Sequence, residues 1–252
     1  MLNADDRLVS AMATRTVARI ATFGVGAAPG SGDLRVWATD VAADTLQHPT
    51  FVLRAAGTAD GAAPVRLQVS GAHQVGNALA AAAVALTQGM SVADVAAALS
   101  RATLQSHWRM ELQERADGVL VVNDAYNANP DSMAAALRTL ASLRRRGGRL
   151  VAVLGDMLEL GPEAAASHRE VGALAAALNV ERLIAVGDFA TDLLEGAGET
   201  VDATIAEDRE AAAAAAAQWL RPADVVLVKA SRGLALESVA ERLFMAPGGE
   251  RK

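Results

Sequence analysis

The sequence predicts an α/β protein in which a shorter mixed unit precedes a doubly wound, Rossmann-like parallel sheet. From residue 111 onward, short apolar runs alternate with helical patterns, as in parallel strands joined by right-handed helical crossovers. One run, Val119–Val122, is apolar at every position, which is typical of a strand buried on both faces. Before residue 108 the strand-like runs follow one another directly. We therefore expect two units, residues 1–108 and 109–252.

The composition limits the classes of function. A chain of 252 residues with 52% apolar and 21% charged residues suits one large or two modest globular domains. The absence of cysteine excludes disulfides, thiolate metal sites and a cysteine nucleophile. A net charge of −6 makes nucleic acid an unexpected partner. No stretch approaches the roughly 18 apolar residues of a membrane helix, and the N-terminus is not a signal peptide. We expect a cytoplasmic monomer without membrane insertion.

In the first unit we expect a loop and then a helix over residues 1–20, capped by Asp5 or Asp6. Its apolar face would consist of Leu8, Ala11 and Met12. Strand-like runs, separated by Gly, Pro and Asp, follow at residues 18–23, 34–38, 50–54 and 65–69. Two apolar helices are predicted next, at residues 71–86 and 92–99, the second capped by Ser91.

In the second unit, strands are predicted at residues 119–122, 150–154, 183–186, 201–204 and 225–228. Helical patterns lie at residues 132–143, 163–178, 207–220 and 234–244. The basic run Arg144–Arg146 is expected to favour the C-terminus of the first of these helices, with Gly147 and Gly148 ending it.

The segment after the first of these strands has the pattern of a ligand-binding turn. Asn123, Asp124, Tyr126, Asn127 and Asn129 make it abruptly polar. It ends on a helix start, where Asn129 suits the cap, Pro130 the first helical position and Asp131 the first turn. A strand, a polar turn and a helix N-terminus form the usual binding unit of an α/β sheet. The alternative is a well-capped turn with no ligand.

Three polar turns are expected at one edge of this sheet, because parallel strands share their C-terminal side. They are residues 123–129, 155–161 and 229–232. The second turn carries the carboxylates of Asp156 and Glu159, and the third carries Lys229, Ser231 and Arg232. Cations suit a carboxylate or phosphate and acids suit an amine, so the edge suits a zwitterion such as a dipeptide. Each turn alone would be equally consistent with a solvated loop.

The segment Asn123-Asp-Ala-Tyr-Asn-Ala-Asn-Pro130 resembles a signature of the Mur ligase family. Residues 153–161, 168–172 and 228–232, and the upstream segments 2–6 and 71–77, are similar to the same family, in family order over nearly the whole chain. The branch they resemble joins D-alanyl-D-alanine to UDP-N-acetylmuramoyl tripeptide in peptidoglycan precursor synthesis. The resemblance implies that residues 1–108 are the C-terminal part of a central ATP-binding domain and residues 109–252 a C-terminal domain.

The resemblance also implies roles for single residues. Asn77 would hold the adenine of ATP, with Gln74 standing where the family has another asparagine. Arg109 would contact phosphate, although His107 and Trp108 replace the family's glycine in the linker 106–111. Asp124 would bind ribose, with Tyr126, Asn127 and Asn129 beside it. The alternatives are helix capping by His73 and Asn77, and an interdomain salt bridge at Arg109. The candidates for receiving D-alanyl-D-alanine are Asp156, Glu159, Lys229, Ser231 and Arg232.

The chain has no phosphate-binding loop of the form Gly-x-x-x-x-Gly-Lys-Ser/Thr, because its only lysines are Lys229 and Lys252. Three features of the family come before the part that this chain resembles. They are the phosphate-binding loop, the carboxylate that binds Mg²⁺ and the domain that binds UDP. We therefore expect the main Mg²⁺ ligands outside this chain, assign no certain metal-binding or catalytic residue within it, and expect the chain alone to be inactive. The alternative is a non-catalytic module that binds a nucleotide or a protein. A dinucleotide-binding dehydrogenase domain is disfavoured, since no Gly-x-Gly-x-x-Gly follows a strand.

Overall fold

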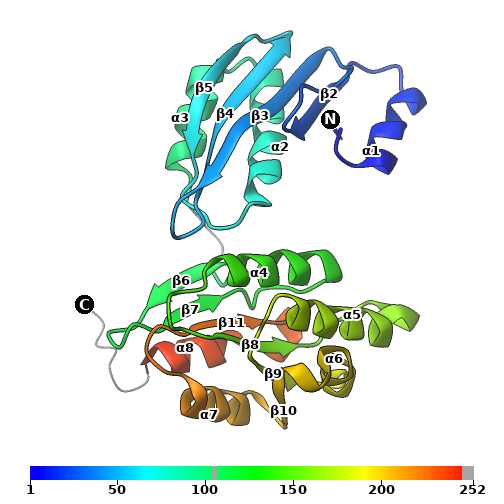
Figure 1. Ribbon diagram of the computed structural model, residues 1–252. Helices are drawn as coiled ribbons and strands as arrows, with labels where there is room; N and C mark the ends of the chain where they lie inside the picture. Colours follow the sequence, from blue (N-terminus) through cyan, green and yellow to red (C-terminus); the bar gives the residue numbers. More distant parts are fainter. Residues whose placement is uncertain (104–106, 246–252) are drawn as a thin grey trace. The chain divides into compact units, whose positions relative to one another are not determined.

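The computed structural model describes residues 1–103 and 107–245 (Figure 1). The chain divides into two compact units, Met1–Leu104 and Gln105–Lys252. The boundary lies just ahead of the expected one at residue 108. In the described ranges, no helix is long and apolar enough to span a bilayer.

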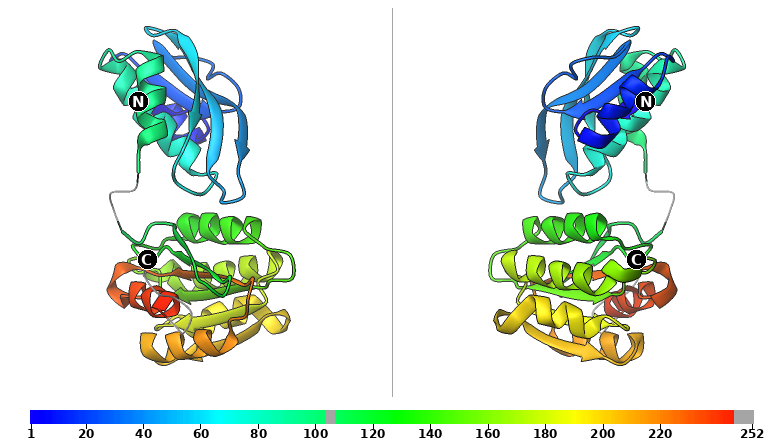
Figure 2. Two further views of the ribbon diagram at one scale, coloured as in Figure 1. Left: turned by 90° about the vertical axis from the view of Figure 1, so that its left-hand side faces the viewer. Right: turned by 90° about the vertical axis from the view of Figure 1, so that its right-hand side faces the viewer.

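The first unit is a five-stranded sheet with helices on one face (Figures 1 and 2). The strands lie in sequence order: β1 (Leu2–Asn3), β2 (Ala21–Val25), β3 (Leu34–Ala43), β4 (Pro49–Gly57) and β5 (Gly61–Arg66). The first three are parallel and the last three antiparallel. Helices α2 (Gln74–Thr87) and α3 (Val92–Arg101) bury the alternate apolar residues of β3 and β4. Ser91 caps α3, as predicted.

The N-terminal helix is shorter than predicted and buries nothing. Asp6 caps α1 (Arg7–Ala11) by accepting from the N–H groups of Leu8 and Val9, and the 3₁₀ turn η1 (Met12–Arg15) follows. Leu8 is 81% exposed and Met12 48%. The prediction that they form a packed face was wrong. A helix of little more than one turn is held by its cap, because it presents no apolar stripe to the sheet.

Two strands of this unit are shifted from their predicted positions. β2 begins at Ala21 rather than residue 18, and β5 covers Gly61–Arg66 rather than residues 65–69. The alternation at its end still holds, because Val65 and Leu67 are both buried. β5 is an edge strand, which explains why it tolerates Pro64, a residue that has no N–H to donate.

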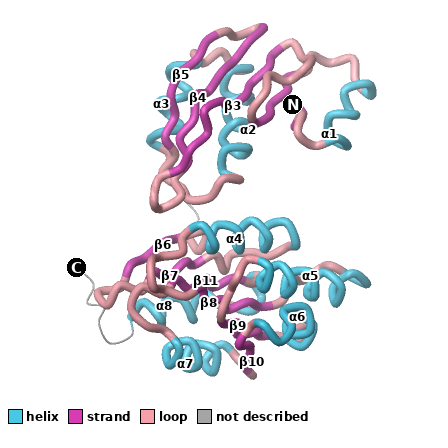
Figure 3. Tube along the Cα trace, in the orientation of Figure 1, coloured by secondary structure: helices cyan, strands magenta, loops and turns pink. Residues whose placement is uncertain are grey.

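The second unit is a six-stranded sheet in the order β10-β9-β8-β11-β7-β6 (Figure 3). Its strands are β6 (Glu111–Glu114), β7 (Leu120–Asn123), β8 (Leu150–Gly155), β9 (Arg182–Val186), β10 (Asp202–Ala206) and β11 (Val225–Lys229). All neighbours are parallel except β6, which runs antiparallel to β7. The predicted α/β class with a doubly wound parallel sheet is confirmed. The sequence did not indicate β6, because its residues are mostly polar and lie at the edge.

Helices cover both faces of this sheet. One core layer packs under α4 (Pro130–Ser142), α5 (Ala164–Ala177) and α6 (Ala190–Ala197). The other packs under α7 (Arg209–Trp219) and α8 (Glu237–Met245). Short 3₁₀ turns are η2 (Gly161–Glu163), η3 (Gly198–Thr200) and η4 (Arg232–Leu234). Helix α6 was not predicted, because eight residues with a glycine give too little periodicity.

The basic run after α4 has another role than the predicted one. The helix ends at Ser142, before the arginines, and its last turn carries no basic residue. Arg144 pairs with Glu181 at 2.6 Å, and Arg145 pairs with Glu114 at 2.7 Å. Arg144 and Arg145 therefore tie the α4–β8 connection to neighbouring parts of the sheet, and the helix ends before the predicted stop at Gly147 and Gly148.

Candidate functional site at the C-terminal edge of the second sheet

The polar turn after β7 leads into a fully capped helix. The Asn129 side chain accepts from the N–H of Ser132 at 2.8 Å, and the Ser132 hydroxyl accepts from the N–H of Asn129 at 3.0 Å. Pro130 occupies the first position of α4. The predicted cap is confirmed. This reciprocal pair satisfies two N–H groups that the helix itself leaves free, so the Asn129 side chain serves the helix start.

Ser231 joins the three polar turns that the strand order brings to one edge. Its hydroxyl oxygen accepts from the N–H of Leu158 at 2.9 Å and donates to the carbonyl of Ala128 at 3.4 Å. Its own N–H donates to the carbonyl of Asp156 at 2.9 Å. Ser231 is 4% exposed. The side chain that was a candidate for substrate contact thus links the turn after β7, the turn after β8 and its own turn.

Lys229 and Asp124, predicted for different ligands, bind each other. The Lys229 ammonium donates to Oδ2 of Asp124 at 2.7 Å and to the carbonyl of Asn127 at 2.8 Å. Their side chains are 3% and 14% exposed. The pair forms because β11 and β7 are neighbours, with Val228 opposite Asn123. A buried lysine needs such a partner, since an unpaired charge in the interior is costly.

A second contact fixes the other oxygen of Asp124. Oδ1 accepts from the N–H of Met110 at 3.0 Å, and the N–H of Tyr126 donates to the carbonyl of Trp108 at 3.0 Å. Trp108 and Met110 have left-handed φ angles of 59° and 49°, which are rare for bulky residues. Residues 108–110 thus lie against the turn after β7. Ser106, the start of the predicted linker, lies outside the described residues.

Two arginines stack on aromatic rings beside this turn. The guanidinium of Arg109 lies 4.1 Å from the ring centre of Tyr126, and that of Arg232 lies 4.1 Å from Trp108 and 5.8 Å from Tyr126. Both arginines are exposed, and neither forms an ion pair within the described ranges. Stacking orients a guanidinium while its N–H groups stay free, which suits an anionic ligand. The stacking of Arg232 on Trp108 was not predicted, because the two residues lie far apart in the sequence.

The carboxylates of the turn after β8 differ from each other. Asp156 is 4% exposed and accepts from the N–H groups of Asp188 at 2.8 Å and Phe189 at 3.0 Å, next to the start of α6. Glu159 is exposed and has a left-handed φ of 66°. The Asp156 carboxylate therefore already accepts hydrogen bonds within the unit, whereas the Glu159 carboxylate remains available to a ligand.

His168 of α5 forms a hydrogen bond with the turn after β8. Its Nε2 accepts from the N–H of Met157 at 2.9 Å, and its Nδ1 faces the carbonyl of Ala164 at 2.7 Å. Because a carbonyl only accepts, the proton lies on Nδ1 and the ring is neutral. The ring is fully buried and stacks on Phe189 at 4.7 Å. The segment 168–172 thus contributes to the shape of the turn.

In the first unit, the candidate adenine residues contact each other. The side-chain nitrogen of Asn77 donates to Oε1 of Gln74 at 3.0 Å on the first turn of α2. His73 stands at the cap position, but its side chain makes no capping hydrogen bond. The capping alternative for these residues was therefore wrong. Asn77 is exposed and Gln74 partly so.

Comparison with known proteins places the chain in a family. Residues 108–232 match the family model described as Mur ligase, glutamate ligase domain. A UDP-N-acetylmuramoyl-tripeptide–D-alanyl-D-alanine ligase from Mycobacterium tuberculosis is 46% identical over 96% of this chain and 50% of its own length. The chain belongs to the Mur ligase family. This confirms the resemblance seen in the sequence.

Other Mur ligases agree with this assignment. The ligase of the same name from Mycobacterium leprae is 40% identical over 96% of the chain. A crystal structure of MurF from Acinetobacter baumannii superposes with a TM-score of 0.79 at 29% identity, covering 97% of this chain and 51% of that one. The chain spans about half the length of the curated relatives it matches.

Proposed function

We propose that this chain is part of an ATP-dependent ligase that joins D-alanyl-D-alanine to UDP-N-acetylmuramoyl tripeptide through an acyl phosphate. The observation that carries the proposal is the similarity over 96% of the chain to relatives named for that reaction. In this proposal residues 1–108 belong to the ATP-binding domain and residues 109–252 form the C-terminal domain. The complete enzyme acts in the cytoplasm as a monomer.

Nucleotide-binding residues are proposed in each unit, taken by itself. Asn77 and Gln74 offer amide groups to adenine, and Asp124 accepts from the ribose hydroxyls. A carboxylate can accept two hydroxyl groups at once. Because Oδ1 and Oδ2 of Asp124 already accept from Met110 and Lys229, the ribose would use their remaining lone pairs. Tyr126 and Asn127, both exposed, flank this position, and Asn129 contributes through the helix start it caps.

The charged groups divide into ligand-facing and positioning ones. Arg109 is proposed to steady phosphate, because a planar guanidinium gives paired hydrogen bonds at fixed charge. Arg232 and Glu159 are exposed and would receive the carboxylate and the ammonium of the dipeptide. Lys229, Asp156 and Ser231 are buried and paired, so we assign them the positioning of the turns.

Mg²⁺ is proposed as a cofactor of the whole enzyme, where it would offset phosphate charge. Within residues 1–103 and 107–245, no group of three or more His, Asp or Glu side chains could hold a metal ion. We propose no metal ligand among the residues named above.

A chimaera tests the proposed function. The half of the Mycobacterium tuberculosis relative that matches this chain is replaced by residues 1–252, and ATP-dependent joining of D-alanyl-D-alanine to the tripeptide is measured. We expect activity. Arg109→Lys should lower kcat/KM for ATP about tenfold or more, since lysine keeps the charge but loses the planar fork.

The matched control is Arg146→Lys, an exposed arginine without an ion pair in the described ranges, which should leave the rate unchanged. A chimaera that melts cooperatively and binds ATP but joins no dipeptide would contradict the proposed substrate. An Arg109→Lys variant with unchanged kinetics would contradict the role of that residue alone.

A further inference from the structure

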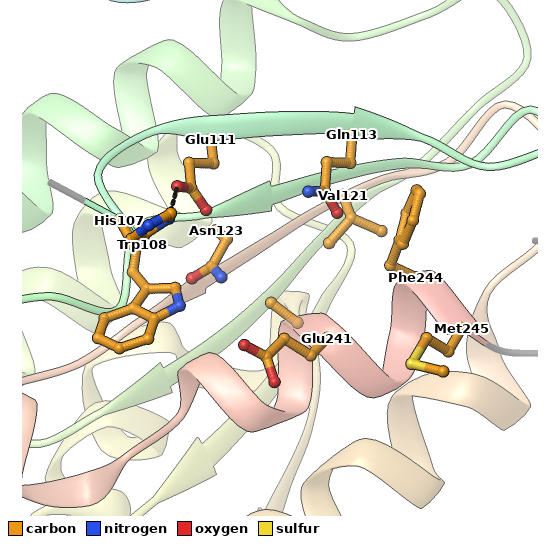
Figure 4. Close-up of a pocket in the computed structure, with 10 residues that line it drawn as sticks. His107, Trp108, Glu111, Gln113, Val121, Asn123, Glu241, Phe244 and Met245 are labelled. Atoms are coloured by element: carbon orange, nitrogen blue, oxygen red, sulfur yellow. Dashed lines mark ion pairs between the residues drawn. The ribbon is translucent and has the colours of Figure 1, made fainter. Parts of the chain in front are cut away.

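A cavity of about 360 Å³ lies on the α8 side of the second sheet, where Trp108 and Asn123 lead into the turn after β7 (Figure 4). Its roof is formed by β6 and β7 and its floor by α8. Figure 4 shows Trp108 at one end and Phe244 and Met245 at the other. The volume is within the range of about 300–1,000 Å³ that small-molecule sites occupy.

The cavity exists because the sheet extends beyond its helix at this edge. Glu111 and Gln113 of β6 pair with Asn123 and Val121 of β7, so these four side chains share one face. The core layer on that face includes Val121 but no residue of β6. The side chains of β6 on this face therefore border an open space beside α8.

One wall of the cavity holds the side-chain amide of Asn123. Asn123 is 7% exposed, and its Oδ1 accepts from the N–H of Ala125 at 3.3 Å. Its amide nitrogen makes no hydrogen bond to any described residue, and Figure 4 shows the amide pointing toward α8. This nitrogen faces the cavity and can donate to the carbonyl oxygen of a ligand bound there.

Two of the remaining polar side chains of the cavity are carboxylates. Glu111 and Glu241 stand on opposite walls (Figure 4). Glu111 faces Nδ1 of His107 at 3.3 Å, whereas Glu241 has no ion pair within the described ranges. The walls at the two ends are the rings of Trp108 and Phe244. Carboxylates attract a cation, and the rings favour a flat apolar group.

We propose that this cavity binds a small cationic amine that carries a flat apolar group and a carbonyl oxygen, as in an aromatic α-amino amide. The ammonium lies between Glu111 and Glu241, the carbonyl accepts from the amide nitrogen of Asn123, and the ring packs against Phe244. A ligand with a free carboxylate is disfavoured by the two acids. This site is independent of the proposed ligase function, because none of these four residues is assigned to nucleotide or dipeptide.

The test uses the whole chain and three probes of similar size. Phenylalaninamide has all three features, 3-phenylpropanamide lacks the amine, and phenylalanine adds a carboxylate. Titrations are followed by ¹H–¹⁵N correlation spectra. We expect saturable shifts confined to β6, β7, α8 and the Trp108 indole, with a Kd on the order of 1 mM for phenylalaninamide. The other two probes should bind at least about fivefold more weakly.

Two variants locate the charge. Glu241→Gln keeps the shape and should weaken phenylalaninamide about fivefold or more, and Glu111→Gln serves if the first variant does not fold. The matched control is Glu170→Gln on α5, an exposed acid on the opposite face of the sheet, which should leave the Kd unchanged. Equal affinity for the amine and its neutral analogue, or no saturable shift in these elements, would overturn the proposal.

Discussion

The ammonium of Lys229 lies 2.7 Å from Oδ2 of Asp124, and the two side chains are 3% and 14% exposed. Each closes the end of a strand, β11 and β7, at the edge where the polar turns meet. Considered from sequence alone, Asp124→Asn should change ATP affinity and leave the melting temperature nearly unaltered. The ion pair changes that expectation, because a substitution of Asp124 also leaves a buried ammonium without its partner.

Removing either member of the pair should therefore destabilise the second unit. We expect Lys229→Met and Asp124→Asn each to lower the free energy of unfolding, because each leaves the charge of the other residue buried without its partner. For Lys229→Met the loss should be about 3 kcal/mol. The double variant should lose clearly less than the sum. Chemical denaturation of all four proteins gives this double-mutant cycle. Additive losses would mean that the two charges do not interact.

The buried pair of Asp224 and Arg149 should make the unfolding free energy depend on pH. Burial alone would raise the pKa of the Asp224 carboxyl, but Arg149 at 2.6 Å and the N–H groups of Arg149 and Arg221 outweigh it and lower the pKa below its usual range. A lowered pKa in the folded state means that the stabilisation is complete above the unfolded value of about 3.9 and is lost as the pH falls below it.

This pH dependence is measured by comparing the wild type with Asp224→Asn. At pH 7 the variant should be less stable by about 3 kcal/mol, and the difference should shrink as the pH falls below about 3.9. Glu199→Gln removes an exposed carboxyl without an ion pair in the described ranges and should show no such trend. A difference that stays constant down to pH 3 would contradict the role given to the ion pair.

A glycine at the contact of α5 with α6 should be irreplaceable. A Cβ at Gly196 would lie 1.9 Å from the carbonyl oxygen of Arg169, so a methyl group there forces the helices apart. Gly196→Ala should lower the free energy of unfolding by about 1–3 kcal/mol, as overpacked contacts do.

Gly76 on α2 provides the opposite case, because no atom lies within 4 Å of its Cβ position. Gly76→Ala should therefore stabilise the protein by about 0.5–1 kcal/mol, because alanine favours a helix. Thermal denaturation of both variants tests this prediction. Gly196→Ala should lower the melting temperature and Gly76→Ala should raise it.

The chain by itself should not hydrolyse ATP above background. Its sequence has no phosphate-binding loop, and Lys229 is occupied by Asp124. The measurement is phosphate release by the purified chain with Mg²⁺ and ATP. Turnover that disappears in Asp124→Ala would show that the chain carries a catalytic site of its own.

Sequence patterns located most of the second unit's elements, because its strands and helices carry their signals locally. The continuous apolar run before Asn123, the cap at Asn129 and the helix start at Pro130 each depend on neighbours within a few residues. The same local signals placed three polar turns at one edge, since parallel strands fix where such turns must lie.

Only the tertiary structure decided how those side chains are used. Lys229 and Asp124 neutralise each other, Asp156 accepts from two N–H groups near the start of α6, and Ser231 links three turns. In each case the partner is distant in sequence and is set by strand order and register. Likewise Leu8 is exposed although its sequence context suits a core, because α1 buries none of its residues against the described part of the chain. Residue types and local spacing determined which groups reach this edge of the sheet, whereas packing over long sequence distances decided which of them remain free for a ligand.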